Sequence, residues 1–107
     1  MIESDAQQSI DDGCLQIIDT DVSLTVPWYI MVMYGRSEMD SEVISNSVLD
    51  KLVKRMLQYW NEIEHRYKEY LSEEDVRLGN PIKEYPGRTE QSVKVLLEIY
   101  HGRRHRN

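Results

Sequence analysis

The residue best equipped for nucleophilic chemistry is Cys14, the only cysteine of the chain. A thiolate attacks and a thiol does not, and the acidic residues near Cys14 raise rather than lower the pKa of a thiol. A lone cysteine also forms no internal disulfide and supplies no multi-cysteine zinc site, which suits a reducing compartment. We therefore expect no covalent catalysis at Cys14.

The three histidines and one run of acids are the other candidates for acid-base or metal chemistry. His65 falls between the polar and apolar faces of a predicted helix, where it is a base, a ligand or a boundary residue paired with neighbouring glutamates. His101 and His105 have the spacing of helical metal ligands, but Gly102 separates them and the sequence offers no third ligand. The run Ser72-Glu73-Glu74-Asp75 is better explained as a helix cap with first-turn acids than as a cation site. We predict no metal site.

Motifs of the large enzyme classes are missing from the sequence. It contains no glycine-rich phosphate loop, no nucleophile elbow and no His-Glu-x-x-His pair. The five glycines are scattered at predicted helix ends and turns. We therefore predict a protein that is not an enzyme and carries no cofactor.

Length and composition predict one small domain. The chain has 107 residues, of which 40% are hydrophobic and 30% charged. No apolar run approaches the ~20 residues that span a bilayer. The N-terminus carries acids where an export signal carries basic residues. We expect a cytoplasmic protein without a membrane-embedded role.

Charge is distributed unevenly around a net value of −6. Residues 1–47 contain nine acids and one base, whereas residues 48–107 contain ten acids and twelve bases. The acidic part is expected to repel nucleic acid. Arg103, Arg104 and Arg106 form a basic tail, which would give weak, salt-sensitive phosphate contacts at most.

Apolar periodicity predicts a mainly α-helical, compact domain of three to four helices. We predict an acidic, disordered arm over residues 1–14, the domain over residues 15–102 and the basic tail over residues 103–107. Alternation over residues 15–26 favours one or two short extended segments. Residues 27–34 indicate a short apolar helix, for which burial is favoured over a face reserved for a partner. In the second case the partner-binding residues would be Trp28, Tyr29, Met31 and Met33, together with His65.

The strongest periodic signal begins at Ser47, whose hydroxyl can cap a helix that has Asp50 as its third residue. Apolar residues then recur at three- and four-residue spacings as far as Leu71. This pattern predicts one long amphipathic helix of about six turns. A short helix between Ser72 and Gly79, a loop over residues 81–88 and a last helix from a Thr89 cap to a Gly102 stop complete the predicted domain.

A set of short motifs between Pro27 and Pro86 resembles a known family. The motifs are Pro27-Trp28-Tyr29-Ile30-Met31, Met39-Asp40, Ile44-Ser45-Asn46, Leu49-Asp50, Trp60-Asn61-Glu62-Ile63-Glu64-His65, Lys68 and Glu84-Tyr85-Pro86. They look like those of small bacteriophage-borne proteins, which are in turn similar to the N-terminal helical domain of NAD-dependent DNA ligases. The resemblance implies a helical scaffold and, if the chain is encoded by a phage, a location in the host cytoplasm.

The ligase domain grips the nicotinamide mononucleotide half of NAD with an aromatic-histidine pair, an acid and a Tyr-Asp pair. With the two sequences matched through Ile44 and Asp50, the aromatic-histidine pair falls on Arg36-Ser37, the acid on Asn46 and the tyrosine on Leu49. Only Asp50 is unchanged. The chain also lacks the Lys-x-Asp-Gly motif of the adenylated lysine, so the resemblance implies no ligation by this chain alone.

Three functional hypotheses follow. The first is a non-catalytic bacteriophage accessory protein that binds and regulates a host or phage protein, one form of which inhibits a host nuclease or defence complex. The alternative is a remnant nucleotide site for NAD or its mononucleotide half, formed by Asp50, Asn46, Tyr34 and Arg36. A second alternative is a nucleic-acid-associated protein that uses the basic tail. The sequence leaves a homodimer open.

Overall fold

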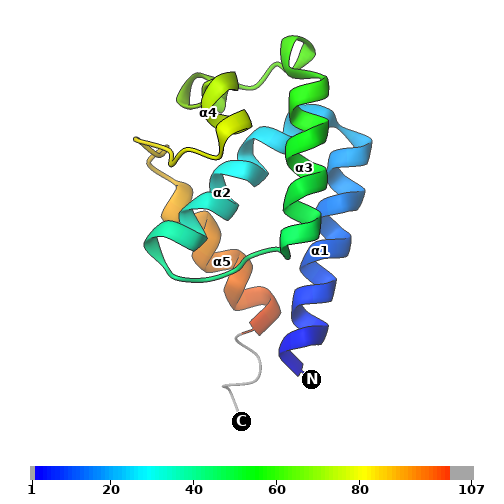
Figure 1. Ribbon diagram of the computed structural model, residues 1–107. Coiled ribbons are helices and arrows are strands. Elements are labelled where there is room, and N and C mark those ends of the chain that lie inside the picture. The colour runs from blue at the N-terminus through cyan, green and yellow to red at the C-terminus, as the bar shows by residue number, and fades with distance from the viewer. Residues whose placement is uncertain (1, 102–107) are drawn as a thin grey trace.

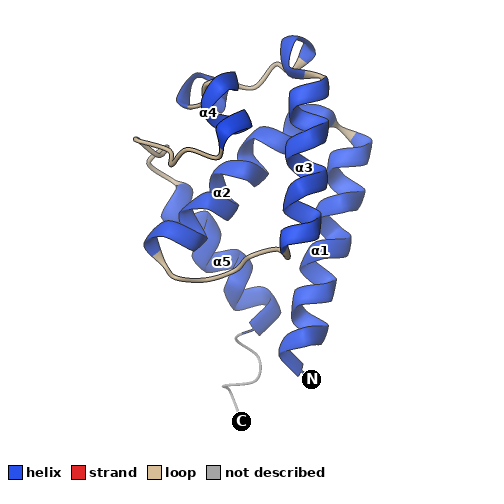
Figure 2. Ribbon diagram, in the orientation of Figure 1, coloured by secondary structure: helices blue, strands red, loops and turns tan. Residues whose placement is uncertain are grey.

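Helices form all the regular structure in the part of the chain that the computed structural model describes, which is residues 2–101, with side chains for residues 8–98. They are α1 (Ile2–Thr20), η1 (Val22–Leu24), α2 (Thr25–Glu38), α3 (Asn46–Gln58), η2 (Trp60–Glu62), η3 (Arg66–Tyr70), α4 (Glu73–Leu78) and α5 (Thr89–His101), where η marks a 3₁₀ helix. Residues 2–101 contain no strand (Figure 2). The predicted mainly α-helical fold is confirmed.

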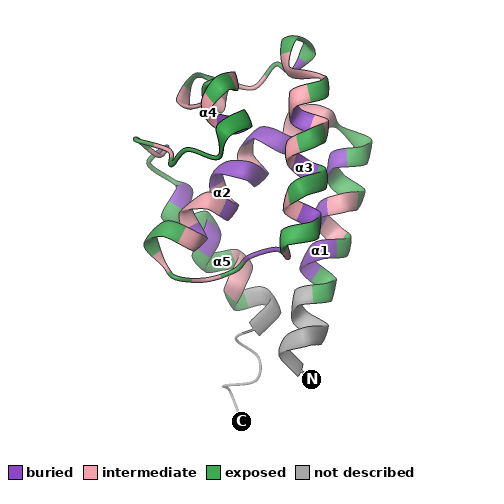
Figure 3. Ribbon diagram, viewed as in Figure 1, coloured by how far each residue is buried: buried purple, intermediate pink, exposed green. Residues whose placement is uncertain are grey.

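The four longest helices pack around one core. α1 and α3 lie side by side, and α2 contacts both α3 and α5 (Figure 1). α5 also contacts α1, and the short α4 packs against α3. Buried residues line the inner sides of these helices (Figure 3). Within residues 2–101, no helix has both the length and the apolar composition needed to cross a bilayer.

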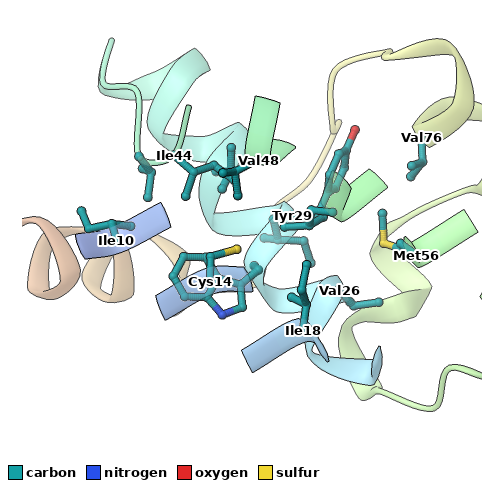
Figure 4. Packing of buried hydrophobic residues seen from close by; sticks show 14 of the residues in the cluster. Ile10, Cys14, Ile18, Val26, Tyr29, Ile44, Val48, Met56 and Val76 are labelled. Atoms are coloured by element: carbon teal, nitrogen blue, oxygen red, sulfur yellow. The ribbon is translucent and has the colours of Figure 1, made fainter. Parts of the chain in front are cut away.

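The segment expected to be a disordered arm belongs to α1. Ile10, Cys14 and Ile18 recur every four residues and are 1%, 0% and 1% exposed, which aligns them along one buried face (Figure 4). Asp11 adds a polar contact, because its Oδ1 accepts a 2.9 Å hydrogen bond from the backbone N–H of Ser45. The predicted arm and the predicted extended segments over residues 15–26 are therefore wrong. A narrow apolar stripe suffices for a helix once other helices cover it.

The start of α3 lacks the predicted capping box. Ser45, and not Ser47, is the N-cap residue, and its side chain makes no capping hydrogen bond. Ser47 and Asp50 are both exposed. The Ser45 backbone instead contacts Asp11 of α1, so a tertiary contact anchors this helix start.

The predicted long helix is also wrong beyond residue 58, where α3 ends. The chain turns through η2 and then extends, with Ile63 only 2% exposed. Lys68 Nζ donates hydrogen bonds to the carbonyl oxygens of Trp60 and Ile63, at 2.7 Å and 3.2 Å. It also lies 4.8 Å from the centroid of the Trp60 ring. Lys68 thus binds two carbonyl oxygens beyond the end of α3, and the Trp60 oxygen also accepts a 3.3 Å hydrogen bond from the Ile63 backbone N–H.

The local signals between residues 72 and 88 are confirmed. Ser72 caps α4 by accepting a 3.3 Å hydrogen bond from the Asp75 backbone N–H. Gly79 ends α4 in the left-handed region, with φ of 74°. Residues 81–88 form a loop, and α5 begins with Thr89 as its first helical residue rather than its cap. The predicted Gly102 stop and the tail residues Arg103, Arg104, His105 and Arg106 lie outside the described residues.

Gly35 lets α2 approach the following loop closely. A Cβ at this position would lie 2.7 Å from Val43 Cγ2 and 3.2 Å from the Ser41 carbonyl oxygen. Gly35→Ala is therefore expected to lower the free energy of unfolding by ~1–3 kcal/mol, although alanine ordinarily favours a helix by ~1 kcal/mol over glycine.

Gly13→Ala is the control for this prediction, because its Cβ would meet nothing within 4 Å and it lies in α1. This variant is expected to gain ~0.5–1 kcal/mol. Urea unfolding of the two variants measures both changes. A gain in stability for Gly35→Ala would contradict the close approach of α2 and the loop.

Candidate functional site

The four residues of the nucleotide hypothesis have different contacts. Arg36 Nη2 donates a 3.1 Å hydrogen bond to the Ile44 carbonyl oxygen and lies 3.9 Å from Glu42 Oε2, while its Nε is buried without a hydrogen-bond partner. Asn46 and Asp50 are exposed on α3. Among the described residues, no hydrogen bond or ion pair joins Asn46 or Asp50 to Arg36.

Tyr34 is directed instead toward α5. Its ring packs edge-on against Tyr85, with centroids 5.0 Å apart, and Tyr85 Oη lies 3.0 Å from Ser37 Oγ. Glu90 is paired with Lys94 at 2.7 Å, which lowers the pKa of the Glu90 carboxyl. Burial, and then the charge of Glu90, raises the pKa of Tyr34. The Tyr34–Glu90 interaction thus links α2 to α5.

The residues proposed for a partner face differ in how far they are buried. Trp28 and Tyr29 are 8% and 2% exposed, so the rings of both side chains belong to the core. Burial of the predicted helix over residues 27–34 is thus confirmed for Trp28 and Tyr29, while Tyr34 is half-buried. Met31 and Met33 are half-buried and remain in contact with solvent.

His65 has a structural role at the start of η3. Its Nδ1 accepts a 3.1 Å hydrogen bond from the Tyr67 backbone N–H, and its ring is tilted against the Tyr67 ring at 5.3 Å. Burial, followed by the charge of Arg66, lowers the pKa of His65, and Asp21 opposes this shift. The neutral imidazole therefore caps a helix.

An apolar hollow lies between α2 and the first turns of α5, and it has a volume of about 580 Å³. It is lined by Met31, Arg88, Gln91, Ser92, Val95 and Leu96. Val95 is 43% exposed and is one of three exposed large apolar side chains among the described residues, and of these three only Val95 lines this hollow. An adjoining hollow of about 180 Å³ shares Met31, Arg88 and Ser92 and adds Pro27, Ile30, Arg66, Tyr67 and Thr89. We call the two together the α2–α5 groove.

The rim of the α2–α5 groove is basic, although the whole chain carries a net charge of −6. Arg88 makes no ion pair or hydrogen bond through its side chain with any described residue. Arg66 lies 5.2 Å from the centroid of the Tyr67 ring and has no acidic partner in the described part of the chain. The N-terminus of α5 adds its partial positive charge. The groove can therefore receive an apolar side chain that is flanked by negative charge.

Sequence reasoning found Met31 but missed Arg88 and Val95. Val93 and Leu96 have the three-residue spacing of a core face in the predicted last helix, and Val95 falls outside that face. A large β-branched residue on the solvent side of a helix was the available signal. The groove itself depends on α2 and α5 meeting, which no local pattern reveals.

Comparison with known proteins identifies no relative: no family model, no curated protein and no solved structure matches the chain. Among residues 8–98, no group of three His, Cys, Asp or Glu side chains could hold a metal ion. Function must be inferred from the groove itself, because a helical fold alone does not specify one.

Proposed function

We propose that this chain is a non-catalytic protein-binding module whose α2–α5 groove receives an amphipathic segment of a partner protein. The observation that carries the proposal is the solvent-facing Val95, 43% exposed, beside Met31 and Leu96 in a hollow of about 580 Å³. Hollows with an apolar floor accept the anchor side chains that dominate most protein interfaces. Met31 adds a flexible surface that adapts to the shape of such an anchor.

The partner segment is expected to carry acidic residues beside its apolar anchor. Arg88 and Arg66 border the groove without acidic partners among the described residues, so a carboxylate on the partner would supply their countercharge. A nucleic acid fits less well, because two arginines make a short phosphate track and the net charge of −6 opposes a polyanion.

The motif resemblance between Pro27 and Pro86 supports a bacteriophage setting for this module. In that setting the partner is a host or phage protein, and inhibition of a host nuclease or defence complex is one form of the activity. The nucleotide-binding alternative lacks comparable support, because Tyr34 and Arg36 contact different neighbours and Asn46 and Asp50 are exposed away from any described hollow.

Selection from a random peptide library tests this proposal. The peptides retained by the wild-type chain are expected to share one large apolar residue next to acidic residues. Val95→Asp and Arg88→Glu are each expected to raise the dissociation constant at least about tenfold, which is typical when an important interface residue is lost. Fluorescence anisotropy with a selected peptide measures the change.

Leu78→Asp is the matched control, because Leu78 is 64% exposed on α4 and does not line the groove. It is expected to bind the peptide like the wild type. Replacing the peptide's acids with lysine should restore binding to Arg88→Glu. Equal affinities of the Val95→Asp and Leu78→Asp variants would rule out the groove as the binding site. If the wild-type chain instead forms an oligomer whose mass rises with concentration, and the Val95→Asp variant stays monomeric, the occupant of the groove would be a second copy of the chain.

A further inference from the structure

A smaller pocket, distinct from the α2–α5 groove, lies where η3, α4 and residues 80–83 meet over α2, and its volume is about 160 Å³. Tyr29 contributes to this pocket, whereas Met31, two residues later, lines the groove. Positions two residues apart point about 200° apart around a helix axis, so the two sites use opposite sides of α2. We call this second site the Tyr29 pocket.

The hydroxyl group of Tyr29 is the unusual feature of the pocket. Tyr29 is 2% exposed, yet its Oη makes no hydrogen bond with any described residue. Figure 4 shows the ring in the core with its oxygen directed away from the α1 side chains, on the side where Val76 of α4 lies. Arg36 Nε is the only buried side-chain polar atom without a partner in the described part of the chain, so the Tyr29 oxygen itself reaches the open space of the pocket. The Tyr29 hydroxyl is therefore available to a ligand in this pocket.

Two carboxylates and one base are the charged groups of the pocket lining. Asp75 Oδ1 accepts a 3.0 Å hydrogen bond from Asn80 Nδ2, which holds the carboxylate at the pocket wall. Glu69 supplies a second carboxylate, and Lys83 is the one base in the lining. Burial, then the charges of Tyr85 and Asp75, raises the pKa of Tyr29, so the phenol stays neutral. This environment disfavours an anion and favours a cation that donates several hydrogen bonds.

The volume and the aromatic lining of the Tyr29 pocket indicate which kind of cation it can bind. About 160 Å³ admits the head of a side chain and excludes a nucleotide or a larger cofactor. Tyr70 adds an aromatic ring to the lining, and a planar cation can stack on such a face. A guanidinium is planar, weakly hydrated and carries five donors, whereas an ammonium is a compact and strongly hydrated point charge.

We propose that the Tyr29 pocket binds a guanidinium group, with Asp75 and Glu69 as countercharges and the Tyr29 hydroxyl as a neutral acceptor. The group is either the side chain of an arginine in a partner protein or a small guanidinium compound. Both sources present the same donors to the pocket. This inference does not depend on the α2–α5 groove.

Titration of the full chain with Nα-acetyl-arginine methylamide, followed by amide NMR shifts, tests the proposal. Saturable shifts are expected around Tyr29, Asp75 and Asn80, and the neutral citrulline analogue should bind at least about tenfold more weakly because it lacks the charge. Tyr29→Phe is expected to bind several-fold more weakly without loss of thermal stability, because it removes a hydroxyl that has no partner in the folded chain.

Asp75→Asn and Glu74→Gln form the matched pair of charge variants. Both remove one negative charge from α4, but only Asp75 lines the pocket. Asp75→Asn is expected to weaken binding at least about tenfold and Glu74→Gln to leave it unchanged. Equal effects of the two variants, equal binding of the citrulline analogue, or equal binding of the lysine analogue would overturn the assignment.

The same titration separates the two sources of the guanidinium. A short glycine peptide with one internal arginine would bind more tightly than free arginine if the pocket recognises a partner protein. The reverse order would identify a small molecule. Either order supports a guanidinium site, whereas shifts that never saturate with any of these probes refute it.

Discussion

Ile10→Asp is expected to abolish cooperative folding, whereas Ile17→Asp, in the same helix, is expected to leave it intact. Ile10 is 1% exposed and Ile17 is 38% exposed, so only the first substitution forces a carboxylate into the core. The lost apolar contacts and the buried charge together cost about 5 kcal/mol or more. Domains of this size are stable by only ~5–15 kcal/mol. One side chain in a segment that resembles a disordered arm would thus decide whether the chain folds.

Circular dichroism during thermal and urea unfolding measures this difference. The Ile17→Asp variant should lose less than ~1 kcal/mol, as is usual for a surface substitution. The wild type should show one cooperative transition, and Ile10→Asp should show a non-cooperative slope or a midpoint far below the wild type. Identical curves for the two variants would mean that α1 contributes little to the core.

Cys14 is expected to react with iodoacetamide about a thousandfold more slowly in the folded chain than in the unfolded chain near pH 8. Its side chain is 0% exposed. Burial, and to a lesser degree the charge of Asp11, raises the pKa of the Cys14 thiol from 9.0 to about 12. Each unit of pKa lowers the thiolate fraction tenfold at a pH below both values, and the thiolate is the reactive form.

The pH dependence provides a second readout. In concentrated guanidinium chloride the alkylation rate should level off above about pH 9, whereas in the folded chain it should continue to rise toward pH 12. Because the folded thiol keeps its proton at a higher pH, its contribution to stability is complete below the unfolded pKa and is lost as the pH rises toward about 12. Mass spectrometry of quenched samples measures the rates. Equal alkylation rates in the folded and unfolded chain would mean that the Cys14 thiol can act as a nucleophile in the folded protein.

The two proposed sites can be tested independently, since Val95 lines only the α2–α5 groove and Asp75 only the Tyr29 pocket. A variant of one should leave binding at the other unchanged. Loss of both activities in either variant would instead indicate a change in the packing of α2, which contributes Met31 to one site and Tyr29 to the other.

The sequence by itself determined the features that depend on neighbours along the chain. The Ser72 cap, the first-turn acids of α4 and the left-handed Gly79 are all satisfied within one short segment. The mainly helical class follows in the same way from apolar spacing, capping residues and turn signals. Part of the low reactivity expected of Cys14 also follows from its neighbours along the chain, because the charge of Asp11, three residues away, raises the pKa of the thiol.

Only the tertiary structure decided the rest. Ile10 is isolated among polar residues in the sequence, and the face that it shares with Ile18 is buried because α3 and α5 cover α1. The apolar periodicity continues past Gln58, but α3 ends there and Lys68 binds the carbonyl groups beyond it. The groove joins Met31 to Val95, which are distant along the chain. Such contacts depend on which helix faces meet, and this is set by packing across the whole core rather than by the preferences of any single segment.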